Sequence, residues 1–478
     1  MDLKGFFNGL GYDISEKQNW DQYLNIWESW YQGKVKKFHN YYIYNGNTKI
    51  KMQKKSLQMA KKLSEDWADL LFNEKVNITV NSKESQEKLN KIFDENNHIV
   101  LLNQGIEKAF AHGTGAFVGS IQDLKYNEET KIVDTIDGKI KIEYVEAKKI
   151  YPLSWEGQKI TECAFVTEKY IKGTKYIYIS MHLLNVLDNY VIQNYLFEVQ
   201  GKSLLTINED VERGFLNEFD TKSNVPWFTI IRPNIVNNIE ENPFGISVYA
   251  NSIDVLKCLD NNYDALDNEV VLSRKRIFVA EDMMTYDNGT EQLTFDPADV
   301  SIYRMPKGFN NQSMIQQSDM NPRIEQYIGG VEFQLNILSQ KSGFGENRYR
   351  FDGNNVQTAT AVISENSDMY RTIKKHELPL ETNIKDIVHF IAYASSTFKN
   401  ENIDDKTITV EFDDSIIEDK NTEKMNYRSE VTMGLRSKKS YMTVARNLNE
   451  EEIQEEFEQM RIEAQNQMIE DEETNITD

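Results

Sequence analysis

Residues 242–270 read NPFGISVYANSIDVLKCLDNNYDALDNEV, and this stretch decides how the rest of the chain is interpreted. After Gly245, apolar side chains recur at steps of three and four residues, which is the spacing of one face of an α-helix. The apolar positions are Tyr249, Ile253, Leu256, Leu259, Tyr263, Leu266 and Val270. Because acidic residues lie between them, the pattern predicts one long helix with an acidic side, from about residue 247 to residue 272.

The sequence that follows alternates between β-type and helical patterns. Residues 274–321 contain β-type runs such as IFVAE and QLTFDPADVSIYRM, and Pro322 then opens a second helical pattern. From Thr358 to about Phe398 the spacing is helical again, with Pro379 inside it. We expect a kink there, because proline removes a backbone donor and clashes with the preceding turn. KTITVEFDDSII (406–417) reads as a strand, and two further helices and an acidic tail follow.

Before the long helix, the pattern indicates an α/β region. Residues 52–72 have apolar side chains near helical spacing and predict an amphipathic helix, and 76–80 alternates like a half-buried strand. Between 99 and 250, short β-type runs separated by charged turns predict mostly antiparallel pairing. The glycines of AHGTGAFVG (111–119) are similar to a phosphate loop, but no GK[ST] follows, so we interpret them as turn glycines.

Size and composition limit the possible functions. A chain of 478 residues, 40% hydrophobic, is expected to fold into several packed units. We find no apolar run near the roughly 20 residues of a membrane span and no signal peptide, which predicts a location in the cytoplasm where it is made. Cys163 and Cys258 are expected to be core thiols. The net charge of −22 argues against tight nucleic-acid binding, although like charge permits a non-adhesive contact with DNA.

The sequence gives little support for catalysis. The six histidines are scattered, and no HExxH or zinc spacing occurs, so we predict no enzyme, no catalytic residue, no metal and no cofactor. Glu411, Asp413 and Asp414 in VEFDDS are the best candidates for metal ligands, although a charged strand end explains them equally well. A metal-dependent phosphodiesterase using these three carboxylates is therefore one alternative.

Four motifs, taken in order, point to a family. They are WADLLFNEKVNITV (67–80), HGTGAFV (112–118), KIYPLSWEGQKITECAFV (149–166) and the 242–270 stretch. With them, the sequence resembles the portal proteins of tailed bacteriophages, in the branch typical of long-tailed phages of Gram-positive hosts. The resemblance implies an α+β portal fold: an α/β wing, a two-helix stem, a small β-containing clip, a kinked helix and a helical crown, assembled as a dodecameric ring.

Carried onto this sequence, the resemblance assigns a part of the ring to each segment. The parts are the wing at 1–245, the stem at 246–273 and 322–341, the clip at 274–321, the tunnel loop at 342–357, the kinked helix and return strand at 358–420, and the crown with its acidic tail at 421–478. The first 45 residues and the acidic tail match no part that we can assign.

The resemblance also implies the function and the partners. A portal forms a channel at one capsid vertex, through which double-stranded DNA passes non-specifically during genome packaging and ejection. The implied partners are the terminase large subunit, a head–tail connector or adaptor protein, and the major capsid and scaffolding proteins, with no membrane. The location would be the virion, after assembly in the host cytoplasm. A passive capsid or scaffold component, without a channel or a terminase partner, is the alternative of the same structural class.

Within such a ring, three groups of residues are candidates for contact with DNA. Gly343, Gly345 and Gly353 would let the tunnel loop shift, Arg348 and Arg350 would meet phosphates, and Tyr349 and Phe351 would pack loop against loop; an ordinary solvent loop is the alternative. Asp254, Asp260, Asp264 and Asp267 would contribute to a negative channel wall, or only solvate a helix or pair between subunits. Arg274, Lys275 and Arg276 in the clip would touch DNA or a docked connector, or only favour a helix C-terminus.

Overall fold

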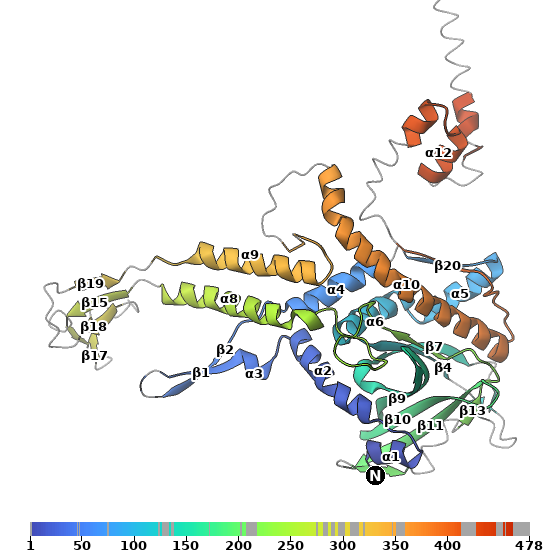
Figure 1. Cartoon of the computed structure of the whole chain (residues 1–478), viewed down its shortest axis with the longest axis horizontal. Coiled ribbons are helices and arrows are strands. Elements are labelled where there is room, and N and C mark those ends of the chain that lie inside the picture. Colours follow the sequence, from blue (N-terminus) through green and yellow to red (C-terminus); the bar gives the residue numbers. More distant parts are fainter. Residues whose placement is uncertain are drawn as a thin grey trace, which may run out of the picture. The chain divides into compact units, whose positions relative to one another are not determined.

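The computed structural model combines helices with mainly antiparallel sheets, as expected of an α+β fold, and β15 and β18 form a parallel pair (Figure 1). It describes residues 2–44, 46, 48–73, 76–122, 125–126, 133–134, 138–171, 173–200, 203–206, 218–273, 276–280, 285–287, 292–294, 302–305, 315–318, 321–346, 348–349, 359–412, 427–445, 453–454 and 456–461. The chain divides into two compact units, residues 1–355 with 367–412 and residues 356–366 with 413–478.

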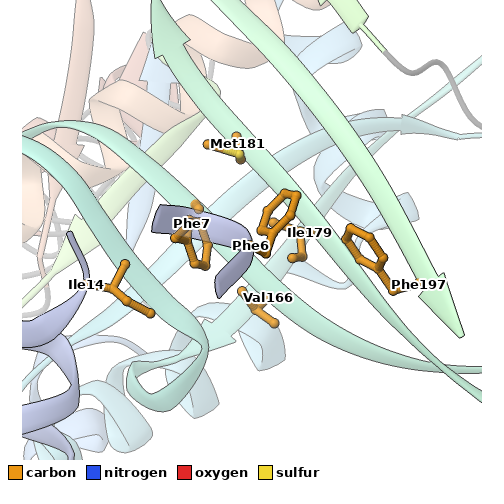
Figure 2. Close-up of a cluster of buried hydrophobic side chains, with 8 residues drawn as sticks. Phe6, Phe7, Ile14, Val166, Ile179, Met181 and Phe197 are labelled. Carbon is orange, nitrogen blue, oxygen red and sulfur yellow. The ribbon is translucent and has the colours of Figure 1, made fainter. Parts of the chain in front are cut away.

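The largest sheet of the first unit is antiparallel throughout, as predicted. Its strands are β8 (Ile150–Glu156), β9 (Lys159–Ile171), β10 (Thr174–Leu184), β11 (Tyr190–Gln200), β12 (Ser203–Thr206) and β13 (Glu218–Asp220). The order is β12-β11-β10-β9-β8, with β13 also pairing with β11. Helix α1 (Leu3–Gly9) covers one face, where Phe6 and Phe7 pack on Val166 and Ile179 (Figure 2). The N-terminus therefore belongs to the core of this sheet.

The other face of the sheet packs against a second, three-stranded sheet. Its order is β14-β4-β7, from β4 (Gly115–Gln122), β7 (Lys139–Glu146) and β14 (Phe228–Ile231). Ala116, Phe165 and Phe228 meet in the cluster between the two sheets. Cys163 is buried there, which confirms the predicted core thiol. The prediction for Cys258 is wrong, because that side chain is exposed.

The N-terminal elements differ from the prediction in one respect. They are α2 (Ser15–Tyr31), α3 (Lys36–His39), β1 (Asn40–Tyr44), β2 (Lys49–Gln53), α4 (Met59–Leu71), β3 (Asn77–Val80), α5 (Lys83–Glu95) and α6 (His98–His112). The predicted helix at 52–72 begins only at Met59, because Met52 pairs with Tyr41 in the β1–β2 hairpin and Gln58 is left-handed with φ 54°. The strand predicted at 76–80 is confirmed as β3, and it pairs with β20 (Ile408–Glu411).

Two motifs that lie far apart in the sequence meet at a glycine contact. Gly113 ends α6 with φ 78°, and a Cβ atom there would lie 2.3 Å from the carbonyl oxygen of Gly245. The backbone N–H of Gly245 donates to Thr114 Oγ1 (3.0 Å), and that of Val248 donates to Phe110 O (3.0 Å). The HGTG and NPFG segments thus fix each other. Their glycines serve helix termination and close backbone approach, as the turn-glycine interpretation requires.

The long helices follow this contact. After η2 (Ala250–Ser252), helix α8 spans Ile253–Leu272, so it begins later than the predicted residue 247, because 246–249 pack against α6 instead. Helix α9 spans Ile324–Lys341. Between them lie β15 (Arg276–Ala280), β16 (Thr285–Asp287), β17 (Gln292–Thr294), β18 (Ile302–Met305) and β19 (Ile315–Ser318), in sheets β18-β15-β19 and β16-β17. The predicted β-containing excursion is confirmed.

Helix α10 (Ala359–Phe398) continues through Pro379, as the sequence predicted. Proline cannot donate to the carbonyl oxygen four residues earlier, which leaves Lys375 O without its helical partner. The side-chain amide of Asn234 donates to that oxygen (2.7 Å), and the backbone N–H of Asn234 donates to Nδ1 of His376 (3.0 Å). A residue outside the helix therefore satisfies the carbonyl that the proline frees.

The second compact unit is mainly helical where it is described. Residues 427–432 and 456–461 are helical, and α12 spans Lys438–Ala445. Met442 and Ile453 are its buried apolar side chains among those described. The helices predicted here are thus confirmed in part, while the acidic tail after residue 461 lies outside the described residues.

The buried His182 gives the first sheet a predicted pH dependence. Its ring lies between Phe165 and Phe228, and burial lowers its pKa to about 3. The unfolded chain binds a proton near pH 6.5 that the folded chain does not, so stability falls as pH drops from 6.5 towards 3. In His182→Phe this loss is expected to shrink by on the order of 2 kcal/mol at pH 5. Urea unfolding at pH 7 and pH 5 measures it, and equal losses in both proteins would contradict it.

Candidate functional site

The candidate site is an antiparallel pair of helices, α8 and α9, with the turn that follows α9 (Figure 1). At one end of the pair, Arg323 Nη2 and Nε each donate to the Glu269 carboxylate at 3.3 Å, and the pKa of Glu269 is lowered by these hydrogen bonds. Midway, Gly330 of α9 faces Asn262 of α8, where a Cβ atom would lie 3.0 Å from the amide nitrogen. The absence of a side chain at Gly330 lets the two helices approach closely.

The pair is packed at one end and exposed at the other. The buried apolar residues near the body are Leu256 and Leu259 of α8 and Val331, Leu335 and Leu338 of α9. Towards the β15–β19 region, Val270, Val271 and Ile328 are exposed, and Phe333 is 66% exposed although it lies between the buried Val331 and Leu335. One chain thus buries only the inner part of the pair. A soluble monomer rarely leaves such apolar side chains uncovered along one element.

The acidic side of α8 is largely occupied by the chain itself. Asp260 is buried; its Oδ2 accepts a hydrogen bond from His39 Nε2 (2.9 Å) and its Oδ1 accepts one from the backbone N–H of Leu57 (3.0 Å). The backbone N–H of Val35 donates to His39 Nδ1 (3.0 Å), so the other ring nitrogen carries the proton given to Asp260. A buried carboxylate with these partners cannot line an exposed channel wall. We therefore leave Asp260 out of the proposed wall.

The other predicted wall residues differ in how far contacts within the chain occupy their carboxylates. Asp264 Oδ1 accepts from the backbone N–H of Lys55 (3.0 Å), and Asp267 pairs with Lys55 Nζ (2.7 Å). The Asp254 side chain is 93% exposed and its contact is with Lys257 of its own helix (2.9 Å), which lowers the pKa of the carboxyl group. Of the four, Asp254 is the carboxylate most available to a neighbour or to DNA.

The turn after α9 is anchored, which the sequence did not indicate. Gly343 has φ 84°; its N–H donates to Gln340 O (3.2 Å) and that of Phe344 donates to Ser339 O (3.0 Å). These two bonds form a Schellman motif, so Gly343 ends the helix. A Cβ atom at Gly343 would also lie 2.7 Å from Thr372 Cγ2. Gly343 therefore fixes the backbone here, contrary to the expected freedom to shift.

Aromatic contacts hold this turn against two helices, α4 and α10. The Phe344 ring stacks on Trp67 of α4 with centroids 4.4 Å apart, and the ring of His376 of α10 meets Trp67 edge-on at 4.9 Å. Tyr349 Oη donates to Asp66 Oδ2 (2.7 Å) and its ring meets Phe344 at 6.0 Å. We call Trp67, Phe344, Tyr349 and His376 the anchor cluster. It ties Tyr349 to its own subunit, where we had expected contact between loops.

The structure describes only some of the other predicted tunnel-loop and clip residues. Gly345 has φ 77°, and Arg348 is exposed, with its guanidinium 5.8 Å from the Phe344 ring centroid. Arg350, Phe351 and Gly353, and also Arg274, Lys275 and the side chain of Arg276, lie outside the described residues. Arg348 is thus an exposed cation in the described part of the loop.

Of the three carboxylates predicted as alternative metal ligands, the structure describes one. Glu411 lies exposed on β20 opposite Asn77, while Asp413 and Asp414 lie outside the described residues. Among the side chains that the structure describes, no three of His, Cys, Asp or Glu gather in a way that could hold a metal ion. Likewise, none of the described helices is long and apolar enough to cross a membrane.

Comparison with known proteins identifies the family. The family model described as "phage portal protein, SPP1 Gp6-like" matches residues 12–470 of this chain. The chain therefore belongs to the phage portal proteins, the structural head-to-tail connectors of bacteriophage virions. No curated protein matches. Among solved structures, a chain titled "Neck of native GTA particle computed with C12 symmetry" is 10% identical, with a TM-score of 0.37, over 81% of this chain and 88% of that one.

The helix cap predicts opposite effects for two glycines of the same element. Gly343→Ala is expected to destabilise the protein by about 1 to 3 kcal/mol, because alanine is strained at positive φ and would meet Thr372. Gly329→Ala in α9, where no atom lies within 4 Å of the new Cβ, is expected to stabilise it by up to about 1 kcal/mol. Urea unfolding measures both, and the same sign for both variants would contradict the cap.

The occupied acidic side predicts a similar contrast within α8. Asp260→Ala leaves the donors of His39 and Leu57 unpaired and buried, which is expected to cost about 3 to 5 kcal/mol. Asp254→Ala, at the exposed position, is expected to change stability by less than about 0.5 kcal/mol. Chemical denaturation of both variants provides the test. Equal small effects would mean that the His39–Asp260 contact does not hold the N-terminal segment.

Proposed function

We propose that this portal protein closes into a dodecameric ring at one capsid vertex and that DNA is packaged and ejected through its axis. The observation that carries the proposal is the helix pair α8–α9, which leaves Val270, Val271 and Ile328 exposed near its outer end and Phe333 exposed midway along α9. Neighbouring copies would cover these side chains, and head-to-tail contacts between identical chains close into rings.

Within this ring, the parts would take the roles expected from the family. The wing, stem, clip, tunnel loop and crown would follow the boundaries 1–245, 246–273 with 322–341, 274–321, 342–357 and 421–478. The partners would be the terminase large subunit, a connector or adaptor, and the capsid and scaffolding proteins. Arg348 would meet phosphates without reading bases, and Asp254 would contribute negative charge to the wall.

The anchor cluster supports a specific form of the tunnel loop. Because the Schellman turn at Gly343 and the Tyr349 hydroxyl hold the loop to the body, the exposed Arg348 between them is the described cation that would approach DNA. Arg348 stands at the junction, held near the Phe344 ring. The loop would then act as a collar projected from a firm base, and the force on it would pass into α4 and α10 through Trp67 and His376.

Arg348 and Lys175 provide a matched pair for testing the loop in the phage that encodes this chain. Arg348→Glu is expected to reduce packaged genomes at least tenfold, because one reversed charge per subunit repels the passing phosphates. Lys175→Glu reverses an exposed cation on β10, whose partner is Glu168, and is expected to leave packaging unchanged. Quantifying DNA-filled capsids measures both. Equal packaging by the two variants would contradict the role of Arg348.

Three further measurements address the alternatives. Electron microscopy of the purified chain is expected to show closed rings, and a chain that stays monomeric at every concentration would contradict the proposal. Mg²⁺-dependent cleavage of DNA that disappears in Glu411→Ala would favour the phosphodiesterase. A passive shell protein would package normally even after residues 343–355 are deleted.

A further inference from the structure

The segment from Ser29 to Ser64 has nine lysines and no acidic residue, in a chain of net charge −22. Four of these lysines contact the chain's own side chains: Lys54 meets Asn261, Lys55 meets Asp267, Lys61 meets Glu107 and Lys62 meets Asp66. The other five are exposed, and no described side chain pairs with their ammonium groups; they are Lys34, Lys36, Lys37, Lys49 and Lys51. Their positive charge is therefore free for a contact with another molecule.

Two of the free lysines share one face of the β1–β2 hairpin with two tyrosines. Residues directly opposite each other in an antiparallel pair point to the same side, and successive residues alternate. Tyr42 lies opposite Lys51 and Tyr44 lies opposite Lys49, so all four side chains lie on one face. The tyrosines are 67% and 66% exposed, and both lysines are exposed. We call Tyr42, Tyr44, Lys49 and Lys51 the basic face of the hairpin.

The basic face has a defined place on the subunit, because the base of the hairpin is fixed to α8. Lys54 Nζ donates to Asn261 Oδ1 (2.7 Å), and the buried His39, which directly precedes β1, bonds to Asp260. Figure 1 shows β1 and β2 on the α8 side of the helix pair. In the proposed ring, every copy would present the same face in the same orientation.

The basic face presents hydrogen-bond donors and little that accepts. Each lysine ammonium group carries three donors and no acceptor. Tyr44 Oη donates to Gly46 O (2.7 Å), which holds its ring at the turn, whereas the Tyr42 hydroxyl has no partner among the described residues. Two ammonium groups and one free hydroxyl group on the same face fit a partner that carries several negative oxygens.

We propose that the basic face of the hairpin binds the phosphate groups of double-stranded DNA without reading the bases. Lys49 and Lys51 would meet phosphate oxygens, and the Tyr42 hydroxyl would donate to one. The inference rests on the proposed function, which brings DNA to this protein, and it adds a contact outside the tunnel loop. A surface of net charge −22 repels DNA over most of its area, so DNA is attracted where the local charge is positive.

The acidic surface of a second copy is the other polyanion that this face could meet, and the charges favour DNA. The predicted acidic side of α8 is largely occupied within each chain, since Asp260 bonds to His39 and both Asp264 and Asp267 contact Lys55. A DNA duplex carries one negative charge per roughly 1.7 Å of its axis. Free lysines therefore gain more from a duplex than from an acidic surface that is already paired.

Lysines also protect sheet edges from pairing with other chains, and this second role sets the design of the test. A glutamate at the same position still places a charge at the edge, but it repels phosphate. An arginine keeps both the charge and the phosphate contact. Replacing Lys49 and Lys51 by glutamate or by arginine therefore separates DNA binding from edge protection.

Fluorescence anisotropy with the full-length chain and a labelled duplex of about 30 base pairs, titrated between about 20 and 200 mM salt, tests the contact. Lys49→Glu with Lys51→Glu is expected to weaken binding at least tenfold at the lowest salt. The slope of log affinity against log salt is expected to become shallower by about 1 for each lysine. Lys49→Arg with Lys51→Arg is expected to stay within threefold of the unaltered chain.

The matched control reverses two other exposed lysines that have no partner among the described residues. Lys83→Glu with Lys91→Glu, on α5, makes the same change in net charge and is expected to leave DNA binding within twofold. Equal weakening by the two glutamate pairs would show an effect of net charge alone and would overturn the inference. A strong preference between two duplexes of unrelated sequence would also overturn it, because phosphate contacts carry no sequence information.

Electron microscopy of the same samples separates this inference from the proposed function. A chain that forms no rings contradicts the proposed function, while its anisotropy still decides whether the basic face binds DNA. Rings whose DNA binding is unchanged in Lys49→Glu with Lys51→Glu leave the proposed function intact and overturn the inference. If that variant instead raises the concentration needed for ring formation and leaves DNA binding unchanged, the face meets a second copy and the inference is wrong.

Discussion

The stacking of Phe344 on Trp67 is the contact on which the arrangement around the candidate channel depends. It joins the end of α9 to α4, and His376 brings α10 to the same indole ring. Burial lowers the pKa of His376 to about 3, so the imidazole is neutral and can accept from the N–H of Asn234. The same Asn234 satisfies the carbonyl freed by Pro379. One aromatic cluster thereby sets where a helix ends, where a loop begins and how a proline-containing helix is held.

A second constraint is electrostatic. The acidic side of α8 is the predicted wall facing DNA. Three of its four predicted carboxylates instead bind residues of this chain's own segment 39–57. Asp260 is buried with His39, and Asp264 and Asp267 meet Lys55. A charged helix face in a sequence is therefore ambiguous between a channel lining and an internal docking surface. Partners that come from more than 200 residues away decide between them, and no local pattern contains that information.

Periodicity and turn chemistry predicted the elements that are fixed locally. The two long helices, the strand at 77–80 and the antiparallel sheet all follow from spacing of two or of three to four residues. What could not be predicted depends on tertiary pairing. Met52 fits a helical stripe but is held in a strand by Tyr41, and Tyr349 looks like a loop aromatic but bonds to Asp66. The cap at Gly343 could have been predicted, since a glycine directly after a helical pattern is typical of a helix C-terminus.

The distribution of buried apolar surface separates what one chain needs to fold from what an assembly needs. Inner residues such as Leu259 and Leu338 are fully covered by the chain itself, so the base of the helix pair is stable without a partner. Among the described residues, Val270, Val271, Ile328 and Phe333 of the helix pair stay exposed. Any copy that covers them binds the folded state selectively, and association then adds to the stability of these regions by mass action. In the proposed ring, neighbouring copies would stabilise the exposed part of the helix pair in this way.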